Sequence, residues 1–161
     1  MSRQGTATDQ DAILAALRVL ALDLGDVRIG VALSDETGTL ASGLVTLRSA
    51  GPRKDAGAVA ALVREHEAQE VVVGLPLRLD GTLGSRGELT VAFVERLRRV
   101  LRVPVVTRDE RLTSVAADER LAEAGVKRRD RKARIDQAAA ALILQEHLDE
   151  RRAPPAGRNL A

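Results

Sequence analysis

Short apolar runs alternate with polar segments in the first part of the chain. Val19 to Leu24 and Ile29 to Leu33 flank the polar segment Gly25 to Arg28, which predicts a β-hairpin closed by a tight turn. The first run is apolar at almost every position, as in a central strand that is covered on both faces. Leu44 to Leu47 predicts a third, edge strand. The pattern therefore predicts three antiparallel strands.

The apolar period becomes helical after residue 50. Two segments, Asp55 to His66 and Phe93 to Leu101, place apolar residues three or four positions apart, which predicts two amphipathic helices. The runs Val71 to Leu75 and Val103 to Val106 follow them as buried strands. Alternation of strand and helix favours parallel pairing through right-handed crossovers. We therefore predict an α/β fold with a five-stranded mixed sheet, three antiparallel strands and then two parallel ones, flanked by helices.

The length of 161 residues is typical of one domain. We expect residues 18–150 to form this domain, residues 1–17 to be a flexible extension and residues 151–161 to be a flexible tail. The chain has no cysteine, and its two histidines, His66 and His147, are far apart in sequence, which argues against a zinc site. Neither a membrane-spanning stretch nor a signal peptide is evident, so we expect a cytoplasmic protein.

Basic residues are concentrated between Lys127 and Arg134. This segment holds six basic side chains and one acid, in a chain whose net charge is +2. Such a run attracts the phosphates of nucleic acids, although an isolated run is often only a solvated loop. Because Phe93 is the single aromatic residue, nucleic-acid binding would rest on phosphate contacts rather than on base stacking.

Acids from three parts of the sequence are candidates for one site. Asp23 ends an apolar strand, where a carboxylate either starts the turn or lies beside a cation. Asp109 and Glu110 follow the last strand, and adjacent side chains point to opposite sides, so we choose the longer Glu110 to face Asp23. The alternatives for this pair are an exposed ion-pair cluster or a helix start. Asp136 borders the apolar stripe Ile135 to Ile143, in the expected first turn of the last helix, where a helix N-terminus also favours a carboxylate.

The segment Gly74 to Arg86 lies between a predicted strand and a predicted helix. In a parallel sheet this position is the carboxyl edge, where ligands bind. Its glycines would let backbone amides approach a phosphate, and Arg86 would add positive charge near the helix N-terminus. A plain connection is the alternative.

Four motifs together resemble the YqgF/RuvX family. They are Leu22-Asp23-Leu24-Gly25 with Arg28-Ile29-Gly30-Val31-Ala32, Val73-Gly74-Leu75-Pro76 with Asp80-Gly81-Thr82, Asp109-Glu110-Arg111-Leu112-Thr113, and Lys132-Ala133-Arg134-Ile135-Asp136. The resemblance runs from about residue 18 to residue 149. It implies a ribonuclease H-like fold and a nuclease that processes the 5′ end of pre-16S rRNA in ribosome biogenesis. It also implies Asp23, Glu110 and Asp136 as catalytic acids, with Asp109 as a further candidate.

The cofactor expected for such a site is a pair of Mg²⁺ or Mn²⁺ ions. Hard divalent cations prefer carboxylate oxygens, and two of them activate a water and stabilise the leaving oxygen of a phosphodiester. We expect Asp23 to bridge the metals, with Glu110 and Asp136 completing the sites. The expected partner is nucleic acid, either pre-rRNA or branched DNA. Its expected contacts are Arg28, Arg86, Arg111, Lys127, Arg128, Arg129, Arg131, Lys132 and Arg134.

Three other functions stay open at this point. The resemblance extends to Holliday-junction resolvases, which would cut branched DNA, favouring a homodimer with two sites. A nucleic-acid-binding module in transcription or ribosome assembly could keep the acids and cut weakly or not at all. Asp-Leu-Gly before a hairpin also resembles the phosphate-binding strands of the sugar kinase and actin superfamily, although this chain has room for only one of the two domains that enclose the nucleotide there.

Overall fold

The structure is a computed structural model that describes residues 17–110 and 128–152. Its strands are β1 (Val19–Leu24), β2 (Arg28–Ser34), β3 (Ala41–Arg48), β4 (Glu70–Leu75) and β5 (Val105–Asp109), and its helices are α2 (Pro52–Glu65), α3 (Ser85–Val100) and α5 (Arg128–Arg152). Nearly all of the expected extension (1–17) and tail (151–161) lies outside the described residues. Among the described helices, none combines the length and apolar character needed to span a bilayer.

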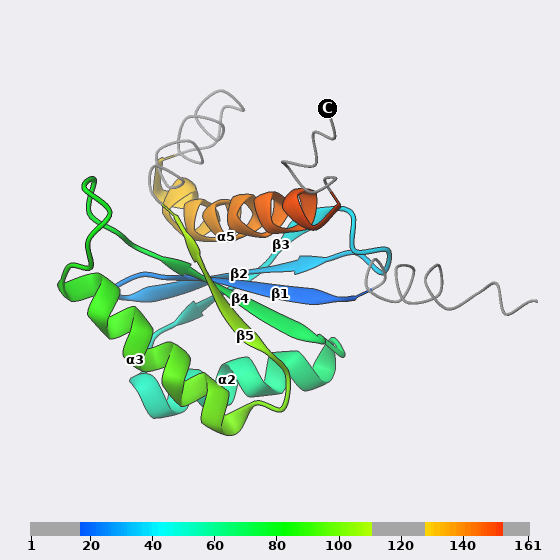
Figure 1. The fold of residues 1–161 in the computed structure, drawn as a ribbon, viewed down its shortest axis with the longest axis horizontal. Helices are drawn as coiled ribbons and strands as arrows, with labels where there is room; N and C mark the ends of the chain where they lie inside the picture. Colours follow the sequence, from blue (N-terminus) through cyan, green and yellow to red (C-terminus); the bar gives the residue numbers. More distant parts are fainter. Residues whose placement is uncertain (1–16, 111–127, 153–161) are drawn as a thin grey trace, which may run out of the picture.

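The five strands form one sheet in the order β3-β2-β1-β4-β5 (Figure 1). β1 pairs antiparallel with β2, and β2 pairs antiparallel with β3. β4 pairs parallel with β1, and β5 pairs parallel with β4. The predicted mixed sheet, with its third strand at one edge, is confirmed.

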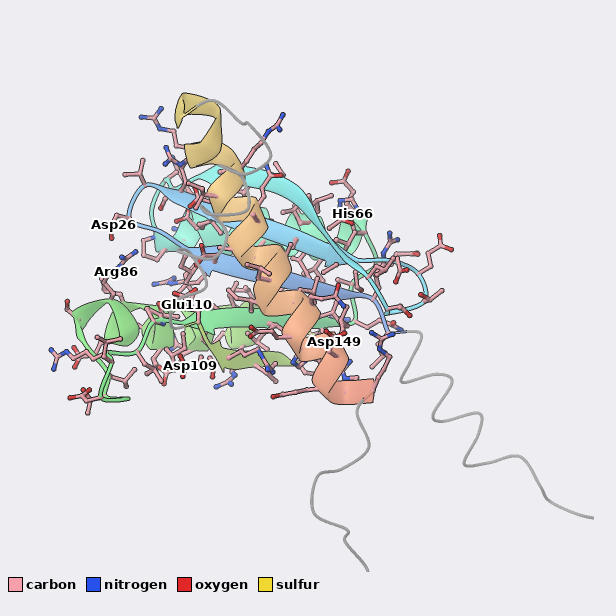
Figure 2. The ribbon with its side chains drawn as sticks, turned by 90° about the horizontal axis from the view of Figure 1, so that it is seen from above. Asp26, His66, Arg86, Asp109, Glu110 and Asp149 are labelled. Atoms are coloured by element: carbon pink, nitrogen blue, oxygen red, sulfur yellow. The ribbon has the colours of Figure 1, made fainter. Side chains whose placement is uncertain are left out.

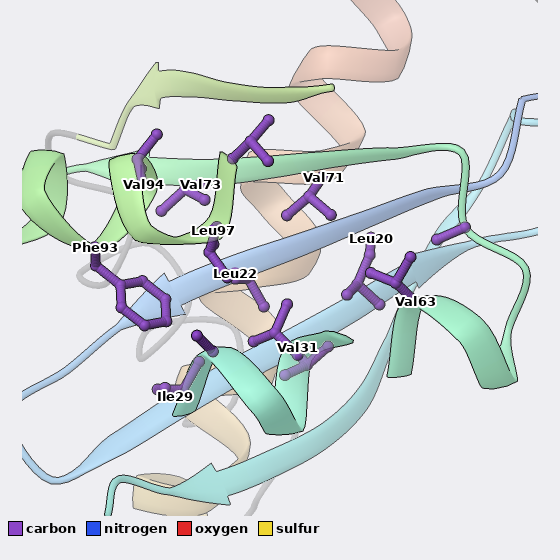
Figure 3. Packing of buried hydrophobic residues seen from close by; sticks show 14 of the residues in the cluster. Leu20, Leu22, Ile29, Val31, Val63, Val71, Val73, Phe93, Val94 and Leu97 are labelled. Atoms are coloured by element: carbon purple, nitrogen blue, oxygen red, sulfur yellow. The ribbon is translucent and has the colours of Figure 1, made fainter. Parts of the chain in front are cut away.

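Two layers of helix cover the sheet, α2 and α3 on one face and α5 on the other (Figure 1). Successive residues of β1 alternate between these layers because side chains of a strand point to opposite faces. Leu20 and Leu22 pack under α2 and α3, in the core that Figure 3 shows. Val19 and Ala21 pack against α5. This double burial explains why β1 is apolar on both faces.

Helix α5 begins earlier than the sequence pattern predicts. It starts at Arg128, so the predicted start near Ile135 is wrong, and residues 128–134 are helical rather than a loop. Arginine, lysine and alanine are good helix formers, which is consistent with the longer helix. Asp136 therefore lies in the third turn, too far from the helix N-terminus for a dipole effect to explain it.

The face of α5 that packs on the sheet is also rotated from the predicted one. The residues of α5 that are fully buried against the sheet are Ala139, Ala140, Ile143, Leu144 and Leu148, whereas the predicted Ala138 and Leu142 are half-buried. Asp136, Ala140 and Ile143 stand four and three positions apart and share one side of the helix. Asp136 is thus not on the border of the apolar stripe but in line with it, facing the sheet.

Gly30 allows α5 to lie directly on β2. A Cβ atom at this position would overlap the backbone carbonyl of Asp136. Gly30 is also the register partner of Asp23 in the β1–β2 pair, so the helix backbone approaches the sheet beside Asp23. The glycine therefore determines how close Asp136 comes to Asp23.

Gly30→Ala is expected to destabilise the fold by about 3 kcal/mol, because the new methyl group meets helix backbone that cannot move away by rotating a side chain. Chemical denaturation measures the change. The matched control is Gly57→Ala in α2, where a Cβ meets nothing within 4 Å and should stabilise by up to about 1 kcal/mol. Equal stability of Gly30→Ala and the wild type would contradict the close packing of α5 on β2.

The C-terminal half of α5 contacts the amino edge of the parallel strands, which is the edge opposite the carboxyl edge that holds Asp23. Arg151 Nη2 donates to Glu70 Oε1 and Oε2 at 2.7 and 2.6 Å, and His147 Nε2 lies 2.5 Å from Glu70 Oε1. At the edge strand, Arg108 near the carboxyl end of β5 pairs with Glu150 at 2.6 Å. The Glu70 contacts hold the C-terminal end of α5 at the start of β4, and the N-terminal half of the helix lies toward the carboxyl edge.

Candidate active site at the carboxyl edge of the sheet

Asp23 and Glu110 meet on the face of the sheet that α5 covers. In β1, Asp23 continues the row of Val19 and Ala21, which pack against α5. Glu110 follows β5 and continues the row of Val106, which also packs against that helix. The two carboxyl side chains are hydrogen-bonded to each other. Residues 87 positions apart in the sequence thus form one acidic pair.

Asp109 lies in the opposite row of β5. Asp109 is on the same side of β5 as Val105, which packs in the core beneath α2 and α3. The Asp109 side chain itself is exposed. The register of β5 against β4 pairs Asp109 with Leu75, and the Glu110 amide donates to the Leu75 carbonyl at 3.2 Å. This register turns Glu110, and not Asp109, toward Asp23.

The Asp23–Glu110 pair shares a proton at neutral pH. Asp23 is only 7% exposed, and burial is the largest cause that raises the pKa of its carboxyl group. Burial, followed by the neighbouring Asp23 carboxylate, raises the pKa of Glu110 to about 9. The protonated Glu110 carboxyl group therefore donates to the Asp23 carboxylate, which avoids two like charges in a desolvated place.

Arg86, near the start of α3, acts electrostatically on this pair. Its positive charge lowers the pKa of both Asp23 and Glu110, against the larger effect of burial. The side chain is 59% exposed, and its Nε lies 3.7 Å from Asp26 Oδ1. Figure 2 shows Asp26, Arg86 and Glu110 at the same end of the molecule. Arg86 therefore lowers the pKa of the two buried acids while its own side chain stays largely exposed.

Asp136 stands beside the pair but has a partner of its own. Arg28 Nε donates to Asp136 Oδ2 at 2.9 Å, with side-chain exposures of 39% and 19%. The Asp136 charge also raises the pKa of Asp23, so the two carboxylates act on each other. In the described part of the chain, no three acids or histidines are arranged as a ready metal-binding group. The structure thus brings Asp23 and Glu110 into contact and leaves Asp136 next to them, paired with Arg28.

The remaining predicted nucleic-acid contacts are placed only in part. Arg134 is exposed on α5. Arg128, Arg129, Arg131 and Lys132 belong to the first two turns of α5, at the end of the helix that lies over the carboxyl edge. Arg111 and Lys127 lie outside the described residues.

The Gly74–Arg86 segment folds back on itself between β4 and α3. Its backbone amides at Arg78, Gly81 and Thr82 donate within the segment, to Thr82, Arg78 and Asp80 respectively. An isolated bridge between Leu77 and Leu83 closes it into a small hairpin. These three amides already have acceptors, so the turn itself does not offer them to a phosphate. Phosphate binding at the start of α3 stays a prediction, and Arg86 is the residue of the segment whose charge acts on the acids.

The sequence predicts Arg28 as a nucleic-acid contact and misses its pairing with Asp136. The partners are 108 positions apart, and no local pattern connects them. The signal that could have found the pair is the spacing of Arg28 and Gly30, two positions apart and so on the same face of β2. Because α5 contacts the sheet at Gly30, Arg28 lies beside this helix.

The metal-free protein is expected to lose stability as the pH rises from the ordinary glutamate value of 4.5 toward about 9. In this window the folded state keeps a proton on Glu110 that the unfolded chain has released, so linkage makes unfolding easier as pH increases. Glu110→Gln should flatten the pH dependence because glutamine keeps a donor and does not titrate. Denaturant unfolding at several pH values measures this, with the exposed Glu95→Gln as control. An unchanged slope in Glu110→Gln would contradict the shared proton.

A family model described as "RuvX: Holliday junction resolvase" matches residues 17–150. The chain belongs to the RuvX family. This confirms the family predicted from the four motifs. Among curated relatives, this RuvX chain is 47% identical over 133 residues to a protein of Syntrophus aciditrophicus, covering 83% of this chain and 89% of the relative. It is 44% identical over 133 residues to a protein of Desulforamulus reducens, covering 83% and 97%. Both relatives are named "Putative pre-16S rRNA nuclease".

The fold of this RuvX chain is similar to that of T. thermophilus RuvC, solved in complex with a Holliday junction substrate. The TM-score is 0.55 at 16% identity, and the match covers 84% of this chain and 95% of the RuvC chain. At this identity the likeness concerns the fold. The predicted ribonuclease H-like fold is confirmed.

Proposed function

We propose that this RuvX protein is a metal-dependent nuclease that processes the 5′ end of pre-16S rRNA. The observation that carries the proposal is the buried, hydrogen-bonded pair of Asp23 and Glu110, with Asp136 beside it at the carboxyl edge of the sheet. In open sheets with parallel strands this edge is where ligands bind. The substrate is taken from the names of the curated relatives at 44–47% identity.

The residues of the site are suited to a hard divalent cation such as Mg²⁺ or Mn²⁺. Asp23 and Glu110 offer carboxylate oxygens, and the proton between them compensates charge in the way that a bound cation would. The metal would be held by Asp23, Glu110 and Asp136. For this, Asp136 would first have to break its ion pair with Arg28. Bound metal ions would supply an activated water and neutralise charge on the phosphate, in a two-metal arrangement.

The chain's own residues then have separate tasks. Glu110 must release its proton before its carboxylate can act as a ligand, so metal binding should strengthen as pH rises. Arg86 is more than half exposed and its charge acts on both acids, so it can bind a non-bridging oxygen of the substrate phosphate. Arg28, freed from Asp136, would supply a second positive charge at the same edge.

The experiment that tests this function is cleavage of a substrate panel with Mn²⁺ or Mg²⁺. The panel contains a labelled pre-16S rRNA leader, a single-stranded RNA of shuffled sequence and a Holliday junction. We expect the leader to be cut near the mature 5′ end by the wild type and not by Asp23→Asn. Cutting of the junction alone would favour the resolvase activity in the family's description. Equal cleavage by wild type and Asp23→Asn would refute the assigned site.

Neutralising the basic start of α5 should weaken RNA binding and flatten its salt dependence. Fewer counterions are released on binding for each phosphate contact that is lost. Changing Arg128, Arg129 and Arg131 to glutamine should therefore reduce the magnitude of the slope of log K against log salt concentration by about 2 to 3. The matched control removes the same total charge at the exposed Arg96 and Arg99 of α3 and at the exposed Arg102, which follows this helix. Filter binding between low and high salt measures both. Identical slopes in the two triple variants would remove the α5 start from the RNA-binding surface.

A further inference from the structure

A cavity of about 190 Å³ opens at the same edge of the sheet, on the face opposite α5. It lies between the β1–β2 turn, the loop that precedes α2 and the first turns of α3. Leu24, Ile29, Leu89 and Phe93 form its apolar wall. Figure 3 shows Ile29 and Phe93 at one end of the core, where this wall begins. The cavity is smaller than the roughly 300–1,000 Å³ of sites for drug-sized ligands, so it suits one small ring system.

Apart from Arg86, the polar side chains of the cavity supply hydrogen-bond acceptors. Asp55 is 8% exposed, and its Oδ1 and Oδ2 accept from the Ala50 amide at 2.8 Å and from the Ser49 hydroxyl at 2.6 Å. The Thr90 hydroxyl proton is donated to the Arg86 carbonyl at 3.0 Å. The hydroxyl protons of Ser49 and Thr90 are used inside the protein, and each Asp55 oxygen already accepts one hydrogen bond. What these side chains can still offer a ligand is further acceptor capacity, including one more hydrogen bond at each Asp55 oxygen.

Arg86 joins the cavity to the acidic pair. It lines the cavity together with Asp26, and its charge acts on both Asp23 and Glu110. A nucleotide whose phosphate lies between Arg86 and the acids would have its base within reach of the cavity. The cavity is thus joined through Arg86 to the proposed cleavage site.

We propose that this cavity binds an unpaired guanine base of the RNA strand, next to the phosphate that is cut. The inference rests on the proposed nuclease function and adds a base preference to it. Sequence-specific recognition of RNA uses unpaired bases that enter protein pockets and are read on their Watson–Crick edge. Guanine carries an N–H and an amino group side by side on that edge, which match the two oxygens of a carboxylate such as Asp55. Uracil and adenine do not offer this pair of donors.

A titration of the metal-free protein with single nucleotides tests the proposal without any cleavage. Isotope-labelled protein is titrated with GMP, UMP and ribose 5-phosphate while backbone amide shifts are followed by NMR. We expect saturable shifts at Ser49, Leu89 and Thr90 with GMP, and about tenfold weaker binding of UMP, in line with the discrimination given by one bidentate contact. Ribose 5-phosphate should shift amides near Arg86 but not those of the cavity.

Variants at the rim separate the cavity from the acids. Leu89→Ser should weaken GMP binding about fivefold through loss of apolar contact, and it should fold normally because Leu89 is 71% exposed. Val100→Ser, at the other end of α3 and 54% exposed, is the matched control and should bind GMP as the wild type does. GMP binding is measured on the metal-free protein and involves no cleavage, so failure of the cleavage assay would leave this result intact.

Three results would overturn the proposal. Cavity shifts of the same size with ribose 5-phosphate would reduce the site to a phosphate contact of Arg86. Equal affinity for GMP and UMP would remove the guanine preference. No saturable shift at the cavity with any nucleotide would show that the cavity takes no base.

Discussion

Asp23→Asn is expected to lower metal-dependent cleavage of the pre-16S rRNA leader by more than about 100-fold, since even residues that only support a metal ligand cost about 10–100-fold when they are changed. Asp23 is central to the proposed site because Glu110 is bonded to it and Asp136 acts on it electrostatically. Asparagine replaces the charged carboxylate with one neutral amide oxygen. This amide oxygen is a poorer ligand for a hard cation than the carboxylate is. Cleavage rates at saturating Mn²⁺ measure the loss.

The same variant should fold at least as well as the wild type. Asparagine fills nearly the same space, can still accept from Glu110, and removes a carboxylate whose charge is disfavoured by burial. Thermal unfolding with and without Mg²⁺ provides the second readout, because a ligand that binds only the folded state raises the melting temperature. We expect Mg²⁺ to raise the melting temperature of the wild type and to have a much smaller effect on Asp23→Asn.

The matched control for this test is Asp149→Asn, which carries the same chemical change at the far end of α5 (Figure 2). Asp149 is 59% exposed and contacts Arg152 on its own helix, so cleavage and the Mg²⁺ response should stay near wild type. A wild-type Mg²⁺ response in Asp23→Asn would exclude Asp23 as a ligand. A loss of activity in both variants would point to a general effect of removing negative charge.

Arg28→Gln is expected to increase the affinity for Mg²⁺ about tenfold. In the wild type, Asp136 must give up a charge-assisted hydrogen bond of 2.9 Å before it can bind a metal. Such bonds contribute about 1.5–3 kcal/mol, and the 39% exposure of the Arg28 side chain places this one near the lower limit. Since about 1.4 kcal/mol corresponds to a factor of ten, removing the competitor should strengthen binding by that factor. The midpoint of a Mg²⁺ titration followed by thermal shift measures it.

Arg48→Gln is the control for this variant because Arg48 is the register partner of Arg28 on β3 and the change in charge is identical. Its Mg²⁺ midpoint should move much less, by the general effect of one positive charge at an exposed position. Arg28→Lys should give an intermediate midpoint, since lysine keeps the charge but not the planar guanidinium. Equal midpoints in Arg28→Gln and Arg48→Gln would separate Asp136 from the metal site.

The sequence by itself determined the architecture of this protein. Short apolar runs and then apolar residues at helical spacing, separated by turn residues, are sufficient to predict three antiparallel strands, two parallel strands and their helices. This works because the core of a layered fold needs that periodicity, whichever residues carry it. The family motifs likewise identify the RuvX membership, which the family match confirms.

The tertiary structure decided which acids meet. Whether Asp109 or Glu110 faces Asp23 depends on the row of β5 to which each belongs, and that row follows from the pairing of Leu75 with Asp109 in the β4–β5 register. A shift of one residue would turn Asp109 inward, and the run of valines in β5 does not mark either face. The pairing of Arg28 with Asp136 likewise follows from the crossing of α5 over Gly30. Strand register and helix contact are properties of packing between distant segments, and for that reason no local pattern of the sequence reveals them.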